Sequence, residues 1–252
     1  MNLSRGIFTR DMLLSLLTFS LIKRVDTVGA VAGTLKPIVR KWLIEMESAT
    51  RELRHGKITA SDWQRQIESL LSRVELPDLL TAIDYDRLAK TAVFPDDHES
   101  ADNVDFSKNE GLPAELSFNP YFYAMRRGVA IVPHGHRNMS SMHMMIKGEA
   151  HSWQFERVLD EERYMTIKPT ADKALKVGDV STMSEQKNNV HWFKALSEPV
   201  FIFNIGVFRI NPTGDFSGRD YIDPVGGEKL KDGLIRARRL ELKEAYRRYG
   251  KS

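Results

Sequence analysis

Residues 128–148 read GVAIVPHGHRNMSSMHMMIKG, and this stretch decides both the fold and the candidate chemistry. Its two halves fit short β-strands, and Lys147-Gly148-Glu149 forms a turn signal after them. His134 and His136 stand two positions apart. Because residues two apart on a strand point to the same side, their imidazoles can be aimed at one point. We therefore predict a pair of metal ligands on one strand, with the third ligand supplied by another strand.

The chain around this stretch, from about residue 120 to residue 210, reads as short strands separated by turn signals. Several short strands at this spacing are typical of an antiparallel barrel or sandwich. Strands are predicted at residues 121–125, 128–132, 142–146, 151–158, 164–168, 190–195 and 200–209.

The first ninety residues predict helices instead. Apolar residues are dense between residues 12 and 22 and indicate a buried helix, and a second helix is expected at about 35–53. A third helix follows Thr59 as its N-cap and is expected to stop at Pro77, with a shorter helix near 78–90.

Changes of composition along the chain predict four regions. They are a helical region (1–93), a connector containing several Pro, Asn and Asp residues (94–119), a barrel domain (120–214), and a C-terminal loop followed by a basic helix at about 229–249 (215–252).

The composition excludes several classes of protein. The chain has 252 residues, no cysteine and a net charge of +3. Disulfides, thiolate metal sites and a cysteine nucleophile are therefore excluded, and a metal site must use His, Asp or Glu. Basic residues are spread along the chain rather than gathered in one run, which argues against a nucleic-acid partner.

The apolar run at residues 12–22 bears on the cellular location. It is shorter than the roughly 20 residues of a membrane-spanning helix, so no membrane span is expected. A basic start precedes it and Ala30-Val31-Ala32 offers a nominal cleavage site, but Lys23 and Arg24 follow it directly. We predict a cytoplasmic protein, with export by an N-terminal signal as the less favoured alternative.

His191 stands directly before Trp192 and, taken alone, could be an ordinary half-buried histidine. His143 shares the predicted inward face of Ser141, and could hydrogen-bond a metal ligand, contact the substrate, be an ordinary core histidine or bind the metal in place of His191. Met142 and Met144 are expected to face away from His143.

The spacing of glycines and histidines resembles the motifs of the cupin superfamily. Gly128 is followed after five residues by His134, and Gly148 stands twelve residues after His136, as in the first cupin motif. The run Gly178-Asp179-Val180, followed by His191 and the apolar strand at residues 200–209, resembles the second motif, and this resemblance implies that His191 is the third metal ligand. The resemblance covers roughly residues 120–210. It implies a mainly β fold with α, a cupin-type antiparallel β-barrel (double-stranded β-helix or jelly roll) preceded by the helical region.

Departures from the motifs narrow the resemblance. Ser141 stands where the first motif usually has a glutamate ligand, which leaves three neutral histidines. This pattern is similar to that of the thiol dioxygenases (the cysteine dioxygenase group), which bind ferrous iron with three histidines. In the second motif Gln186 and Asn188 replace the usual Pro and Gly, and the spacing is two residues longer.

The resemblance implies a mononuclear non-haem iron dioxygenase that inserts oxygen into a small anionic substrate, with thiols as one option. Fe(II) is the expected cofactor, and Zn, Mn and Ni are alternatives. Three imidazoles leave the charge of a divalent cation uncompensated, which independently favours an anionic ligand. The expected partners are this substrate and dioxygen, and the N-terminal helices could cover a barrel mouth or build a homo-oligomer.

Further site residues follow from the same resemblance. In thiol dioxygenases an arginine anchors the substrate carboxylate, so Arg126 and Arg127 are substrate-binding candidates together with Trp192; a solvated surface position is the alternative for each arginine. Tyr123 and His143 are the catalytic candidates. Two other functions stay open, a metal-dependent cupin isomerase or hydrolase, and a non-catalytic cupin that binds a small ligand.

Overall fold

The structure is a computed structural model that describes residues 36–106, 112–113 and 115–251. The helix predicted within residues 12–22 lies outside the described residues. No helix in the described part of the chain is long and apolar enough to cross a membrane.

Helices precede the barrel, as predicted, with a correction to where they end. The third helix starts with a capping box, in which Thr59 and Asp62 satisfy each other's backbone N–H groups. It ends at Leu71 rather than at Pro77, because Pro77 lies in the first turn of the next helix, where its missing N–H costs nothing. Asp84, with a left-handed φ of 56°, divides the short helix predicted at 78–90 into two. The helices are α2 (Pro37–Arg54), α3 (Ala60–Leu71), α4 (Leu76–Ala82) and α5 (Tyr85–Thr91).

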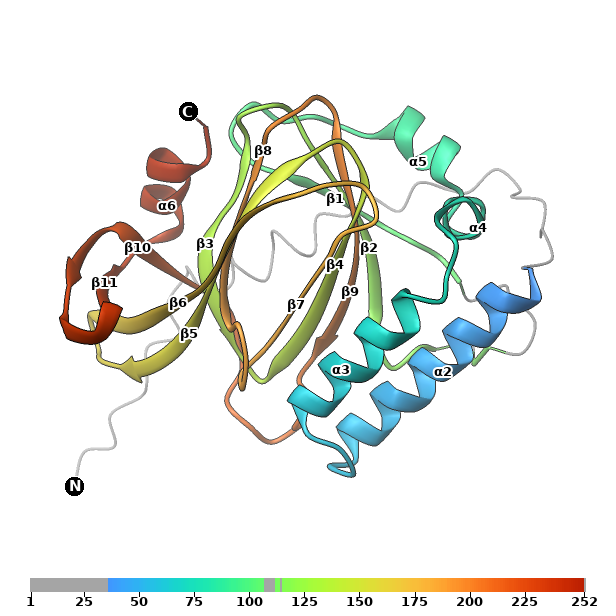
Figure 1. Cartoon of the computed structure of the whole chain (residues 1–252), viewed down its shortest axis with the longest axis horizontal. Helices are drawn as coiled ribbons and strands as arrows, with labels where there is room; N and C mark the ends of the chain where they lie inside the picture. The colour runs from blue at the N-terminus through green and yellow to red at the C-terminus, as the bar shows by residue number, and fades with distance from the viewer. Residues whose placement is uncertain (1–35, 107–111, 114, 252) are drawn as a thin grey trace, which may run out of the picture. The chain divides into compact units, whose positions relative to one another are not determined.

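The strands form two antiparallel sheets (Figure 1). The first has the order β1-β2-β9-β4-β7 and the second the order β10-β11-β6-β5-β8-β3, which closes on itself. The strands of the first sheet are β1 (Ser100–Asn103), β2 (Asn119–Met125), β4 (Met139–Lys147), β7 (Val180–Ser184) and β9 (Val200–Phe208). Those of the second are β3 (Ala130–Arg137), β5 (Ala150–Asp160), β6 (Tyr164–Leu175), β8 (Val190–Ala195), β10 (Ser217–Lys229) and β11 (Ile235–Arg239).

The order of strands identifies the architecture. Between β2 and β9 the chain passes back and forth between the sheets, and the orders β2-β9-β4-β7 and β3-β8-β5-β6 are those of a jelly roll, or double-stranded β-helix. The predicted fold class, a β-barrel of this type preceded by helices, is therefore confirmed. All the predicted strands are present, whereas β1, β7, β10 and β11 were not predicted.

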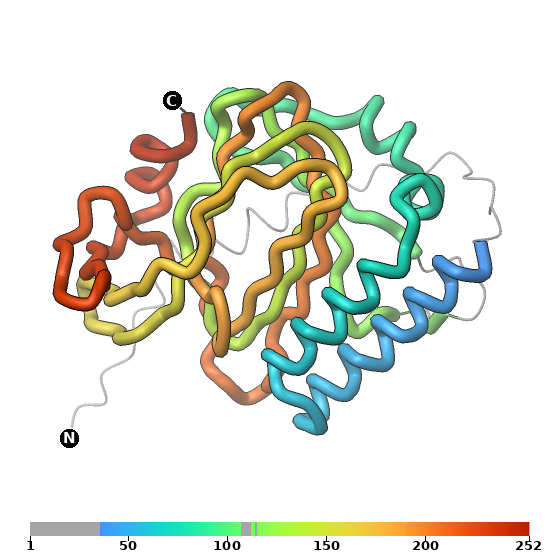
Figure 2. The backbone as a smooth tube through the Cα atoms, viewed as in Figure 1, coloured from blue at the N-terminus to red at the C-terminus, as the bar shows by residue number. Residues whose placement is uncertain are grey.

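The two faces of β4 show where the cores lie. Met142 and Met144 face away from His143, as predicted, and share a core with Trp42 of α2 and Trp63 of α3. Met145, on the opposite face, belongs to the core inside the jelly roll. Figures 1 and 2 show α2 and α3 running side by side over the sheet that contains β4. Both faces of this sheet are thus buried.

The C-terminal segment differs from the prediction. Residues 229–249 were expected to form one basic helix, and this is wrong, because they hold a single 3-10 turn (Lys231–Gly233), strand β11 and the short α-helix α6 (Leu242–Tyr249). Ile235 and Ala237 alternate with arginines, which is a strand period. Both side chains are buried in a small core with Ile167 of β6, with which β11 pairs. Strands β10 and β11 thereby join β6 to β3 and close the second sheet.

Candidate metal centre

A β-bulge aims the first two histidines into the jelly roll. Ile131 of β3 pairs with Phe193 of β8, but the next aligned pair is His134 with His191. Three steps along β3 therefore match two along β8, so one extra residue is inserted in β3. The bulge includes Pro133, which has no N–H to contribute to a regular ladder. It turns His134 to the same inner side as Ile131.

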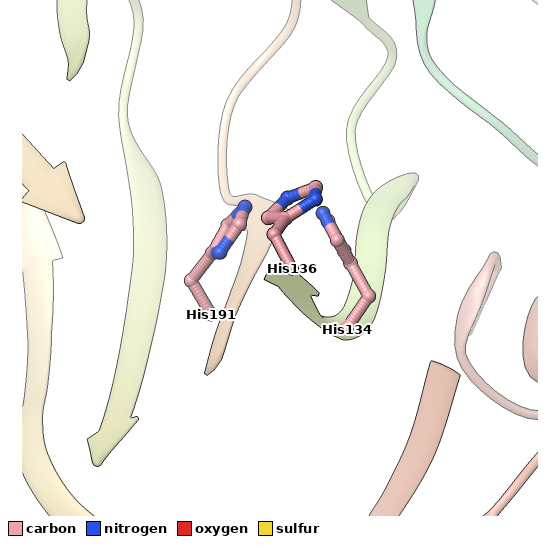
Figure 3. Close-up of side chains that lie close together, drawn as sticks. All are labelled: His134, His136 and His191. Carbon is pink, nitrogen blue, oxygen red and sulfur yellow. The ribbon is translucent and has the colours of Figure 1, made fainter. Parts of the chain in front are cut away.

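The three predicted ligands come together, as Figure 3 shows. The ring centroids of His134 and His191 lie 4.2 Å apart, those of His134 and His136 4.6 Å, and those of His136 and His191 5.3 Å. One ring nitrogen of each lies within 4.8 Å of the others. The exposed fractions of the three residues are 1%, 7% and 1%. Among the described residues, no other group of His, Asp or Glu side chains lies close enough together to hold a metal ion.

A backbone carbonyl lies within hydrogen-bond reach of the Nδ1 atom of each of these histidines. His134 Nδ1 faces Val132 O at 2.7 Å, His136 Nδ1 faces Gly218 O, and His191 Nδ1 faces Asn189 O at 3.4 Å. A carbonyl can only accept, so each Nδ1 must carry the proton. Each Nε2 is then left with a free lone pair, which is the tautomer that a metal ligand needs.

The surroundings keep the histidines neutral. Burial, then the neighbouring His191, Arg219 and His136, lowers the pKa of His134 well below its usual value. Burial, then the charge of Arg219, lowers the pKa of His136 to about 3. The pKa of His191 is also lowered well below its usual value, first by burial and then by His136 and His143. Uncharged imidazoles at neutral pH are ready to bind a cation.

No carboxylate joins the cluster at the place where the cupin motif usually has one. Ser141 is buried, and its hydroxyl donates to the carbonyl of Ile205 on β9 and accepts from the side-chain amide of Asn204. Both hydrogen bonds of the Ser141 hydroxyl therefore go to β9 and not to the histidine cluster. The candidate ligand set is three neutral imidazoles, which suits iron, zinc, copper or nickel.

A buried arginine that the sequence did not single out contributes a positive charge. The side chain of Arg219 on β10 is 12% exposed, and its Nη1 lies 2.7 Å from Glu99 Oε1, with Tyr246 OH at 3.2 Å. Although burial opposes the charged form, Glu99 and the tyrosines around it hold the pKa of Arg219 well above its usual value. Its charge acts on His134, His136 and on the other buried histidines of the site.

The two catalytic candidates lie inside the jelly roll. The rings of Tyr123 and His143 are stacked with their centroids 6.3 Å apart, and the ring of His143 lies 5.5 Å from that of His191. Burial raises the pKa of Tyr123 to about 12, so its hydroxyl stays protonated. His143 Nδ1 is buried without a hydrogen-bond partner. Tyr123 also hydrogen-bonds Arg219, which links the tyrosine to the positive charge.

The three substrate-binding candidates are not brought to this cluster. Arg126 and Arg127 are both exposed in the turn after β2, and Arg126 pairs with Asp96 at 3.2 Å. Trp192 is on the face of β8 opposite to His191 and Phe193, because neighbouring strand residues alternate. It stacks on Trp153 of β5, with ring centroids 3.9 Å apart.

Comparisons with known proteins find similar solved structures but no relative by sequence. No protein-family model matches the sequence, and no curated protein matches it. Solved structures similar to this chain include an uncharacterised protein with a double-stranded β-helix domain from Klebsiella pneumoniae (15% identity, 52% of this chain and 91% of that chain, TM-score 0.36). Others are a cupin superfamily protein from Desulfitobacterium hafniense (10%, 48% and 87%, 0.31) and KdgF from a Halomonas species (14%, 46% and 84%, 0.32).

Proposed function

We propose that this protein is a mononuclear non-haem iron dioxygenase that acts on a small anionic substrate, with thiols as the first class to test. The observation that carries the proposal is the buried triad of His134, His136 and His191. Their Nδ1 atoms are committed to backbone carbonyls, so three Nε2 lone pairs are available from one enclosed site.

The donor set fits a transition metal better than a hard cation. Imidazole is a poor ligand for magnesium or calcium, which prefer oxygen, and a good one for iron. Because none of the three donors is charged, the full charge of the divalent ion is left to attract an anion. Ferrous iron, when bound, would supply open coordination positions and a redox-active centre, while the substrate that is oxidised would supply the electrons that reduce dioxygen.

The chain's own residues supply a positive charge, a hydrogen-bond donor that can orient the substrate, and an apolar lining that excludes water. Arg219 adds a positive charge within the walls of the site and takes over the anion-binding role predicted for Arg126 and Arg127. Tyr123, protonated at neutral pH, offers a hydroxyl that can donate to a bound anion. Phe193 and Met145 line the interior beside His143 and exclude water.

The test combines metal content with oxygen uptake. Protein purified without affinity metals is loaded anaerobically with iron and then assayed with small thiols that carry or lack a carboxylate. We expect about one iron per chain. Replacing His134 or His136 by Ala should abolish binding, whereas His151→Ala should not, since His151 pairs with Asp172 on the outside. Oxygen consumed only when a thiol is present supports the dioxygenase.

The second candidate function is a metal-dependent hydrolase or isomerase. Three imidazoles are also the ligand set of some hydrolytic zinc sites, and this observation favours it. Such a protein would retain zinc or manganese and consume no oxygen with any thiol. A protein that binds no metal in either assay would contradict both enzymes and favour a barrel that binds a small ligand.

A further inference from the structure

His136 lies just beyond the last regular pair between its strand and β8. The ladder between β3 and β8 ends at the pair His134 with His191, so no β8 residue is aligned with His136 in this ladder. The side chain of Asn189 takes that place. The N–H of His136 donates to Asn189 Oδ1 at 3.3 Å, and Asn189 Nδ2 donates to the carbonyl of His136 at 2.9 Å. A carboxamide has the same donor and acceptor as a peptide, so this pair continues the ladder with a side chain.

Asn189 also contacts the third ligand. Its backbone carbonyl lies 3.4 Å from His191 Nδ1, and its Nδ2 has a second acceptor in the carbonyl of Ser184 at 3.2 Å. The residue is 1% exposed, so these bonds do not compete with water. One asparagine therefore holds the backbone of His136 and the ring of His191.

The glycine between the first two histidines makes room for this side chain. A Cβ atom at Gly135 would lie 2.8 Å from Asn189 Oδ1 and 3.0 Å from a methyl group of Val190. These distances are shorter than ordinary contacts, so a larger residue at position 135 would have to displace the carboxamide. The His-Gly-His spacing thus has a steric reason in addition to the strand period.

Arg157 reinforces the same carbonyl. Its Nη1 donates to the carbonyl of His136 at 3.1 Å, and its guanidinium is fixed by Asp160 and Asp220, each with an atom pair at 2.8–2.9 Å. The backbone of His136 is therefore anchored by Asn189 on one side and by Arg157 as a second donor to its carbonyl.

We propose that Asn189 is a positioning residue of the metal centre, which sets the distance between the ligating nitrogens of His136 and His191. This inference rests on the proposed function, because it requires that the histidines bind a metal. Asn189 has no part in the chemistry itself and acts only through the two ligands.

The experiment compares Asn189→Ala with Asn204→Ala in the metal-free full chain. Asn204 is a matched control, because it is 2% exposed and also donates twice, to Ser141 Oγ at 2.7 Å and to the carbonyl of Met142 at 2.8 Å. Each variant is titrated with Co²⁺ against a competing chelator, and the visible spectrum of the bound cobalt and the melting temperature are recorded. We expect Asn189→Ala to bind Co²⁺ about tenfold more weakly, with a changed spectrum. Asn204→Ala should lose melting temperature but keep the wild-type affinity and spectrum.

Gly135→Ala should break the same hydrogen bonds by pushing the Asn189 carboxamide away from the backbone of His136. It provides the test if Asn189→Ala does not fold. It should weaken and alter cobalt binding in the same direction. Wild-type affinity and spectrum in the Asn189 or Gly135 variant, or an equal loss in Asn204→Ala, would overturn the inference while leaving the metal centre intact. Wild-type protein that binds no Co²⁺ would instead overturn the proposed metal centre and, with it, this role of Asn189.

Discussion

The two sheets of the jelly roll are built differently, and β4 and β3 represent them. β4 pairs with β7 and β9 residue by residue from Ser140 to Met144, and its register with β9 shifts once, between Met145 and Lys147. β3 shifts register against both of its neighbours, β8 and β10. The first, more regular sheet is buried on both faces and packs against the helices, while the second, irregular sheet carries His134, His136 and His191. Irregularity frees backbone carbonyls such as that of Val132, and the freed carbonyls orient the imidazoles.

The largest expected effect is a loss of stability, without loss of metal binding, when the core of the regular sheet is disrupted. Phe203 of β9 is fully buried against Trp42 and Phe106, so Phe203→Ala should lower the free energy of unfolding by about 4 kcal/mol. His134→Ala in metal-free protein should cost about 1 kcal/mol. Urea unfolding and equilibrium dialysis with Co²⁺ measure both properties. Folded Phe203→Ala protein should still bind the metal, and failure to do so would mean that the two sheets are not independent.

The next effect concerns the buried ion pair between Arg219, on β10 of the irregular sheet, and Glu99, just before β1 of the other sheet. Arg219→Met leaves the carboxylate of Glu99, with a side chain 5% exposed, buried and unpaired. We expect a loss of about 3 kcal/mol in the free energy of unfolding. Adding Glu99→Gln should restore most of it, because no charge is then left buried. Equal stability of the single and double variants in urea would show that the pair is not desolvated.

A smaller effect is a dependence on pH inside the barrel. Burial, then the charges of His136 and Arg219, lowers the pKa of His143 from about 6.5 to about 3. Between these values the unfolded chain binds a proton that the folded chain does not, so stability is present above pH 6.5 and is lost as the pH falls. Protonation of His143 in the unfolded chain should by itself lower the free energy of unfolding by about 2 kcal/mol between pH 7.5 and pH 5. Metal-free His143→Leu should show a weaker pH dependence than wild type by this amount in urea unfolding.

The smallest effect tests the helical layer. Thr59→Ala removes one half of the capping box at the start of α3 and should lower the free energy of unfolding by about 1 kcal/mol. Cobalt affinity should not change, because α3 packs on the regular sheet. A change in affinity comparable to that of Asn189→Ala would show that the helices reach the metal centre.

The cluster of His134, His136 and His191 could be predicted from the sequence because its signals are local. His134 and His136 stand two residues apart on a strand, and glycines mark the turns around it. At Gly148 the φ of 77° and the carbonyl of Pro199, 2.6 Å from where a Cβ would stand, both require glycine. His191 followed from the second motif in the same way. The bulge at Pro133 left this prediction intact because it lies before both histidines.

The features that could not be predicted from the sequence are those whose partners are far away along the chain. Arg219 lies in a stretch of Gly, Asp and Ser that reads as a turn, and nothing near it indicates Glu99, 120 positions earlier. Strand β11 was not predicted because the leucines in residues 229–249 are spaced like those on one face of a helix. Arg126 and Arg127 were chosen by nearness to the motif in sequence, and the turn after β2 places both in solvent.

The carbonyl of Gly218 has a consequence for the order in which the protein folds. It orients the ring of His136 across a separation of 82 residues, so the ring cannot be held until β10 has docked on β3. Contacts so distant in the chain form late, because closing a long loop precedes any gain from the contact. A growing chain on the ribosome therefore cannot orient His136, and cannot complete the candidate metal centre, before β10 (Ser217–Lys229) has emerged.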